Sequence, residues 1–283
     1  MRDGLDRWVS GRAIAAVQVR HPRAIRRHRP GRLDFERRLR GQRVQAVRRR
    51  GKYLWFELDQ TSLCIVGHLG MSGQMLLQPA TSAEPKHLHI VVTFADDGPQ
   101  LRFVDQRTFG GLMLDTLVPA RDDAGDLVPT TIAHIGRDPL DPRFDPTTVR
   151  ARMRAKHSEV KRVLLDQSFV SGIGNIYADE SLWRARLHPQ TPASAISAVK
   201  SGQLWREVHA VLTESLRAGG TSFDSLYVNV NGESGYFDRT LNAYGRENEP
   251  CPRCGAPIRR GAFMNRSSYF CPRCQRPAGP GPT

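Results

Sequence analysis

Four cysteines near the carboxyl end constrain the fold of this chain more than any other feature. They form two Cys-x2-Cys pairs separated by sixteen residues, Cys251 with Cys254 and Cys271 with Cys274. Two thiolate pairs on tight turns can supply all four ligands of a tetrahedral zinc ion, and such a closed set leaves no open position for a substrate. The spacing therefore predicts one structural Zn2+ in a module over residues 238–278, followed by a tail at 279–283.

The zinc module carries positive charge without any negative charge. No acidic residue follows Pro250. Six arginines lie in and around the ligand set: Arg253, Arg259, Arg260, Arg266, Arg273 and Arg276. The whole chain has a formal net charge of +14 and a pI near 10.3, which favours a polyanionic partner. We interpret the module as a clamp for nucleic-acid phosphates, with a zinc ribbon that binds protein or no partner as the alternative.

The number of cysteines and the lengths of the apolar runs also limit the cellular compartments in which we expect this protein. Five cysteines among 283 residues do not make a disulfide framework, and Cys64 lies in an apolar run that predicts a buried strand. No run approaches the roughly 18 apolar residues that span a bilayer, and the amino end lacks the apolar core of a signal peptide. We therefore expect a cytoplasmic protein with no membrane partner.

Hydrophobic patterning changes character along the chain, from strand-like to helical. Short, often alternating runs between Gly, Pro, Asp and Ser turns predict strands at 13–20, 44–48, 53–58, 62–68, 87–94 and 101–104. Helical periodicity predicts helices at 147–156, 160–167, 177–185 and 195–218. The Pro- and Asp-rich stretch between these regions predicts a linker at 132–146. The result is an α+β chain with a β domain at 1–131 and a helical domain with a following loop at 147–237.

Lys52 and two glycine-rich turns are the other candidates for chemistry. Lys52 follows a glycine at the mouth of a strand, where an amine can serve Schiff-base or elimination chemistry. The turn GHLGMSG carries His68 and Met71, and the turn GIGN places Asn175 at a helix start, where backbone amides can bind a phosphate. A packed core methionine and an ordinary helix–helix turn are the alternatives.

Taken in order, these segments resemble the bacterial formamidopyrimidine-DNA glycosylases, which are zinc-containing bifunctional DNA repair enzymes. The match spans essentially the whole chain through GKYLWFEL, GHLGMSG, KHLHI, FVDQRTFGG, VKRVLLDQ, GIGNIYADE, GGTSF, GESGYF, YGRE and NRSSYFCPRCQ. The resemblance implies an N-terminal β-sandwich, a hinge, and a helical domain with a helix–two-turn–helix element and a four-cysteine zinc finger. It also implies a monomer that acts on damaged double-stranded DNA at the bacterial nucleoid.

The resemblance assigns one group of residues to the gap that a flipped-out nucleotide leaves in the duplex. Met71, Arg107 and Phe109 match the family residues that fill this gap, with Phe109 as a wedge between bases and Arg107 facing the orphaned base. His68, in the same turn as Met71, is counted among the DNA-binding residues.

A second group is assigned to the backbone and to strand cleavage. His87 and Lys156 match family DNA contacts, and Asn175 and Arg266 match the pair that holds the phosphates flanking the lesion. Arg266 is also assigned a part in the final elimination, and Lys52 matches the lysine used in strand cleavage. The implied activity is that of a DNA glycosylase and AP lyase for 8-oxoguanine and formamidopyrimidines. An endonuclease VIII-like enzyme for oxidised pyrimidines is the alternative within the enzyme class.

The amino end departs from the family pattern. Family members continue after the initiator Met with Pro-Glu, whose proline amine attacks the sugar C1′ and whose glutamate is the general acid, whereas Arg2 and Asp3 stand here. Residues 3–9 match the interior of the family's first helix, and no capping residue precedes them, so about nine residues are expected to come from an upstream start. The alternative is a protein that binds damaged DNA without cleaving it.

Overall fold

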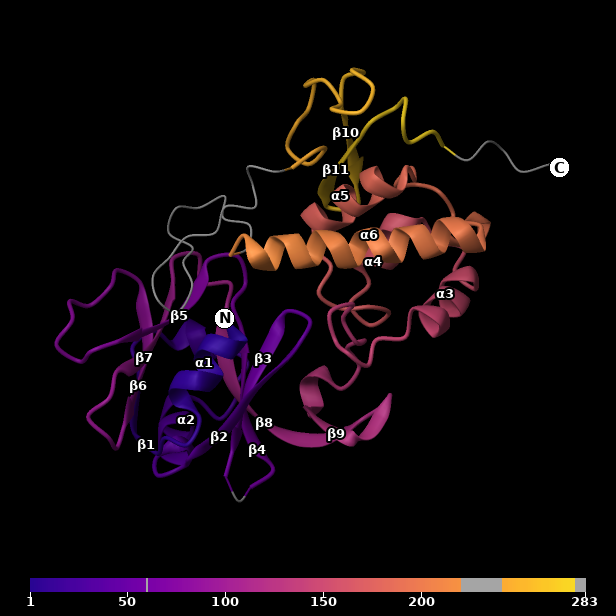
Figure 1. Ribbon diagram of the computed structural model, residues 1–283. Coiled ribbons are helices and arrows are strands. Elements are labelled where there is room, and N and C mark those ends of the chain that lie inside the picture. Colours follow the sequence, from indigo (N-terminus) through magenta and orange to yellow (C-terminus); the bar gives the residue numbers. More distant parts are fainter. Residues whose placement is uncertain (60, 220–240, 278–283) are drawn as a thin grey trace. The chain divides into compact units, whose positions relative to one another are not determined.

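The computed structural model describes residues 1–59, 61–219 and 241–277 (Figure 1). Contacts divide the chain into two compact units, with the boundary between His134 and Ile135. The loop expected at 227–237, most of GGTSF and all of GESGYF lie outside the described residues, as does the expected tail at 279–283.

The N-terminal unit is built from two antiparallel sheets. One has the order β1-β6-β7-β5, with bounds Ile14–Val19, Leu88–Phe94, Gln100–Asp105 and Gly73–Gln78. The other has the order β2-β3-β4-β8-β9, with bounds Val44–Arg50, Tyr53–Leu58, Leu63–His68, Gly111–Ala120 and Asp123–Pro129. Buried side chains from both sheets form one hydrophobic core, which makes this unit the expected β-sandwich.

Alternation of side chains explains these strands. In β1, Val17 and Val19 are buried while Ala16 and Gln18 face solvent, because successive residues of a strand point to opposite faces. Two helices, α1 (Arg2–Val9) and α2 (Arg32–Leu39), add Leu5, Val9, Phe35 and Leu39 to the core. The arginines of α2 remain on its outer face.

The helical unit is held by α3 (Pro146–Arg154), α4 (Val160–Leu165), α5 (Asn175–Ala185) and α6 (Ala198–Arg217). Asp145 caps α3 by accepting from the amides of Thr147 and Thr148, and Ser197 caps α6. Figure 1 shows α6 as the long helix that runs beside α5, with which it is in contact. Apolar residues of these helices form a second core, separate from that of the sandwich.

The four cysteines flank a hairpin at the carboxyl end. Strand β10 (Arg259–Phe263) pairs with β11 (Arg266–Phe270), and both follow Cys251 and Cys254 and precede Cys271 and Cys274. The fold class expected from the sequence, a β-sandwich with a helical domain and a four-cysteine finger, is therefore confirmed. None of the helices in the described residues is long and apolar enough to cross a membrane.

Candidate functional site

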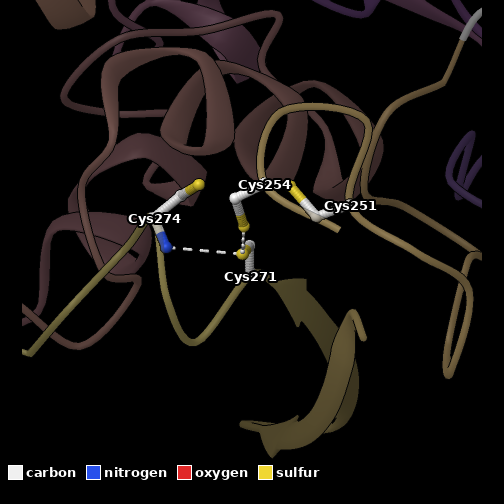
Figure 2. Close-up of side chains that lie close together, drawn as sticks. All are labelled: Cys251, Cys254, Cys271 and Cys274. Atoms are coloured by element: carbon white, nitrogen blue, oxygen red, sulfur yellow. Dashed lines mark hydrogen bonds between the residues drawn. The ribbon is translucent and has the colours of Figure 1, made fainter. Parts of the chain in front are cut away.

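The four cysteine sulfurs converge on one point. Figure 2 shows the side chains of Cys251, Cys254, Cys271 and Cys274 gathered between the two knuckles, and the four Sγ atoms lie within 4.8 Å of one another. The Cys254 and Cys271 sulfurs are 3.5 Å apart. Tetrahedral coordination with Zn–S bonds of about 2.3 Å would place sulfurs about 3.8 Å apart. The donor set and its spacing thus fit a metal ion with four thiolate ligands.

The electrostatics of the cluster favour a bound cation. Burial raises the thiol pKa of Cys251, but backbone amides at Arg253 and Cys254 and the indole of Trp183 outweigh it and lower that pKa to about 6. Burial and the neighbouring Cys254 raise the pKa of Cys271 to about 12. Four thiolates cannot all ionise side by side without positive charge between them, and a divalent cation supplies that charge.

Helix α5 fixes the hairpin through a buried ion pair. The Asp179 carboxylate lies 2.6 Å from the Lys161 ammonium of α4, and both side chains are fully buried. Asp179 also accepts from the Ser268 hydroxyl at 3.1 Å and from the Tyr269 amide at 2.9 Å. Burial raises the pKa of Asp179 to about 6, even though Lys161 and these donors lower it. The pair therefore ties β11 to both helices.

The next residue of α5 holds the segment that leads into the zinc module. Glu180, also buried, accepts from the backbone amides of Asn242, Ala243 and Tyr244 at 2.8–3.1 Å. These amides lie just before and at the start of YGRE (244–247), which precedes the first cysteine pair. The zinc module is therefore held by α5 both at residues 242–244, which precede its first cysteine pair, and at its hairpin.

Asn175 and Arg266 are brought to neighbouring positions in this unit. Asn175 is the first residue of α5, and its side-chain amide donates to the Ser267 carbonyl at 2.9 Å. The Asn175 Oδ1 atom is buried and has no hydrogen-bond partner among the described residues. Arg266, directly before Ser267, is exposed at the start of β11. The Lys161 ammonium donates to the same Ser267 carbonyl at 3.2 Å, which fixes the backbone beside Arg266.

In the sandwich, two turns bring the exposed candidates for base-stack insertion together. Met71, in the turn between β4 and β5, is 62% exposed, and Phe109, in the turn between β7 and β8, is 45% exposed. The Arg107 guanidinium lies 5.3 Å from the centre of the Phe109 ring. The Arg107 amide donates to the Ser72 hydroxyl at 3.0 Å, which links the second turn to the first. The linked turns thus carry two exposed apolar side chains together with an arginine.

Lys52 and His68 line one cavity of the sandwich, of about 230 Å³. Its remaining lining residues include Arg49, Tyr53, Leu69 and Gly70. The His68 Nδ1 atom accepts from the Gly70 amide at 3.0 Å, and the ring lies 4.8 Å from that of Tyr53. Burial, followed by the charges of Arg27, Lys52 and Arg26, lowers the pKa of His68 to about 4. His68 is therefore neutral at pH 7.

The two remaining candidates lie on different units. His87 precedes β6 with a positive φ of 64°, and its carbonyl accepts from the Asp105 amide at 3.1 Å. Lys156 is exposed just after α3, with its ammonium 5.8 Å from the centre of the Phe169 ring.

Three family models match consecutive parts of the chain. The formamidopyrimidine-DNA glycosylase N-terminal domain matches residues 1–112, the H2TH domain of the same enzymes matches 135–226, and a zinc finger found in FPG and IleRS matches 248–277. The chain belongs to the formamidopyrimidine-DNA glycosylase family. The cysteine cluster is thus the metal site of a zinc-finger domain, and α5 is part of the H2TH domain.

Curated relatives and solved structures agree with this assignment. The formamidopyrimidine-DNA glycosylase of Salinispora arenicola is 58% identical over 275 residues, which cover 97% of this chain and 93% of that protein. That of Streptomyces avermitilis is 57% identical, with 98% and 95% covered. A crystal structure of Lactococcus lactis Fpg in complex with DNA containing an abasic site superposes with a TM-score of 0.80 at 29% identity, covering 97% of this chain and 96% of that one.

The glycosylase motifs also contain residues whose roles the sequence does not reveal. Lys161, Asp179, Glu180 and Asp105 lie inside VKRVLLDQ, GIGNIYADE and FVDQRTFGG, yet each is an ordinary charged residue by type. The signal that singles them out is full burial with several hydrogen bonds, which only the tertiary structure supplies.

Proposed function

We propose that this protein is a bifunctional DNA glycosylase and AP lyase of base excision repair. It removes 8-oxoguanine and formamidopyrimidines from duplex DNA as a monomer and then nicks the strand. The observation that carries this proposal is the pair of joined turns that exposes Met71 and Phe109 beside Arg107. Apolar wedges of this kind separate stacked bases, and extrusion of the target nucleotide is required before an enzyme can reach its base.

Basic and polar residues of both units are candidates for contacts with the DNA phosphates. We assign His87, Lys156, Asn175 and Arg266 to the DNA backbone, with Asn175 and Arg266 adjacent through Ser267. The zinc finger holds one Zn2+ in a structural role, because all four cysteines are used as ligands and no position is left open. Held in this way, the hairpin presents Arg266 on a rigid support.

The chemistry begins with a neutral amine. An N-terminal amine has an ordinary pKa near 8, so part of it is unprotonated at neutral pH, unlike a lysine near 10.4. In the proposed reaction its nitrogen forms a bond to C1′ as the glycosidic bond breaks, and the base leaves with a proton from the general acid. The nitrogen then loses a proton, and the C1′–O4′ bond breaks as O4′ takes up a proton, which opens the sugar ring and gives a Schiff base. Elimination then removes a C2′ proton and expels the 3′ phosphate, aided by Lys52 and Arg266.

Borohydride trapping tests this proposal directly, because reduction converts the Schiff base into a stable protein–DNA bond. We would compare the chain as printed with a form extended by the family's Pro-Glu segment, both on a duplex with 8-oxoguanine. Trapping of the extended form alone assigns the nucleophile to that segment. Trapping of both forms contradicts this placement and points to another amine, with Lys52 tested first by Lys52→Gln.

Two further substrates separate the alternatives. A duplex with an oxidised pyrimidine that is cleaved faster than the 8-oxoguanine duplex would favour the endonuclease VIII-like enzyme. Tight binding to an abasic duplex without trapping of either form would favour a damage-binding protein without catalysis.

A further inference from the structure

The exposed turn 106–110 is fastened to the sandwich by one arginine. Arg26, directly after the short 3-10 helix Pro22–Ile25, donates to the carbonyls of Thr108 at 3.1 Å, Phe109 at 2.7 Å and Gly110 at 2.8 Å. Its guanidinium also donates to the Arg23 carbonyl at 3.1 Å. Thr108 has a positive φ of 53°, an uncommon conformation for a β-branched residue. One planar fork thus binds three consecutive carbonyls of a strained turn.

A buried carboxylate joins this turn to the neighbouring one. Asp105 is fully buried, and its two oxygens have different partners: Oδ1 accepts from the Ser72 hydroxyl at 2.5 Å, and Oδ2 accepts from the Gly110 amide at 2.7 Å. Ser72 in turn accepts from the Arg107 amide. Asp105 and Ser72 therefore connect the backbone on both sides of Phe109 to the turn that carries Met71.

The two turns are also in direct backbone contact. A Cβ at Gly70, which has a φ of +66°, would lie 2.7 Å from the Gly110 nitrogen and 2.9 Å from the Phe109 carbonyl carbon. A Cβ at Gly110 would lie 2.8 Å from the carbonyl oxygens of His68 and Leu69. With no room for a side chain between them, the turns move together or not at all.

We propose that Arg26 and Asp105 are positioning residues that hold Met71, Arg107 and Phe109 as a single preformed wedge. This inference rests on the proposed function, since it assumes that the three side chains enter the DNA. Its physical content is preorganisation: a turn already fixed in the free protein loses less conformational freedom when it enters the base stack. Arg26 acts through the carbonyls of the turn and not through DNA.

An exposed arginine can also bind a DNA phosphate, and the two roles predict different results. A phosphate contact needs charge alone, so Arg26→Lys would keep it and Arg26→Gln would lose it. Loss of one phosphate contact makes the negative slope of log K against log salt shallower by about 0.9. Loss of positioning leaves that slope unchanged, and a lysine ammonium lacks the fork that serves three carbonyls, so both substitutions impair the wedge.

The experiment measures the dissociation constants of the full chain for a duplex with a tetrahydrofuran abasic analogue and for the same duplex undamaged, over a series of salt concentrations. We expect Arg26→Lys and Arg26→Gln each to reduce the preference for the abasic duplex about tenfold, equivalent to about 1.4 kcal/mol, at an unchanged salt slope. Arg29→Gln removes an exposed arginine of the same segment and is the matched control, with the wild-type preference. Ser72→Ala, which cuts the link between the turns without removing charge, should resemble Arg26→Lys.

Three outcomes overturn the inference. In the first, both Arg26 variants keep the wild-type preference for the abasic duplex. In the second, Arg26→Lys behaves as wild type while Arg26→Gln has a shallower salt dependence. The third is a loss of preference in Arg29→Gln equal to that in the Arg26 variants. Phe109→Ala separates this failure from that of the proposed function. If Phe109→Ala keeps the wild-type preference, the wedge itself is wrong. If Phe109→Ala loses the preference and the Arg26 variants keep it, only the positioning role is wrong. Melting temperatures of all variants identify any that fail to fold.

Discussion

Removal of one partner from the Lys161–Asp179 ion pair should destabilise the helical unit strongly. Asp179→Asn leaves the Lys161 ammonium with no exposed surface and without its counter-charge, 2.6 Å from a neutral amide. Breaking a buried pair in this way costs about 3–5 kcal/mol. The Asn Oδ1 atom can accept from the Tyr269 amide while Nδ2 donates to the Ser268 hydroxyl, but Nδ2 then lies beside the Lys161 ammonium, which is a second donor. With an m value of about 2 kcal/mol/M, the urea midpoint of this unit should fall by about 2 M.

Hydrogen exchange in urea is the suitable assay, because peptides from 160–185 report the helical unit separately from the sandwich. Glu159→Gln is the matched control: it breaks the Glu159–Arg162 pair on the same helix, at 2.8 Å, where the two side chains are 35% and 47% exposed. That pair should contribute less than about 1 kcal/mol. Asp179→Asn variants that unfold at the same urea concentration as Glu159→Gln would refute the reasoning from burial.

Three further predictions concern the metal ligands, the protonation of His68 and the contacts of Glu180 with residues 242–244. Cys254→Ser should release the metal and abolish binding to an abasic duplex while the sandwich stays folded, as measured by zinc content, affinity and circular dichroism; retained affinity would contradict the clamp. Because the folded unit holds His68 neutral down to about pH 4 while the unfolded chain takes up a proton near pH 6.5, the stability of the sandwich should fall as the pH drops through this window, and His68→Gln should weaken that dependence in urea titrations. Glu180→Gln replaces one of the two acceptor oxygens with the NH2 group of a carboxamide, a donor that faces the backbone amides of 242–244. The stability measured in the same exchange assay should fall by about 1.5–3 kcal/mol, whereas Glu247→Gln, at an exposed position, should leave it unchanged.

Elements with a clear period could be predicted from the sequence. Residues 53–58 form β3 with the expected bounds. The strand expected at 44–48 extends two residues further, to Arg50. Strand β9 (DAGDLVP) was not predicted because Asp and Gly have low strand propensity, and it forms at the sheet edge through pairing with β8. Helix α2 has only Phe35 and Leu39 on its buried face, too few to show a period among its charges. The helix expected at 160–167 ends at Leu165, where Asp166 becomes extended.

In the candidate site too, residue type and sequence spacing identify some functional residues, whereas others are distinguished only by their tertiary contacts. The cysteine set could be predicted because four thiolates at paired spacing have few other uses. Arg26 could not be singled out, because thirteen arginines lie between positions 20 and 52 and their sequence neighbours are alike. Only the tertiary contacts separate it, since its fork meets three carbonyls from a turn more than eighty residues away.

Helix α5 explains why a short motif can support the whole zinc finger. Asn175, Asp179 and Trp183 follow one another at intervals of four, so their side chains lie on one face of the helix. Asn175 donates to Ser267, Asp179 accepts from Ser268 and Tyr269, and the Trp183 indole donates to the Cys251 sulfur at 3.4 Å. These three side chains thus contact the zinc module at the start of β11 and at Cys251, one of the metal ligands. A hydrophobic period does not detect this set, because two of its three members are polar. Loss of the metal should therefore free the knuckles before the hairpin, since the Asn175 and Asp179 contacts do not involve the cysteines.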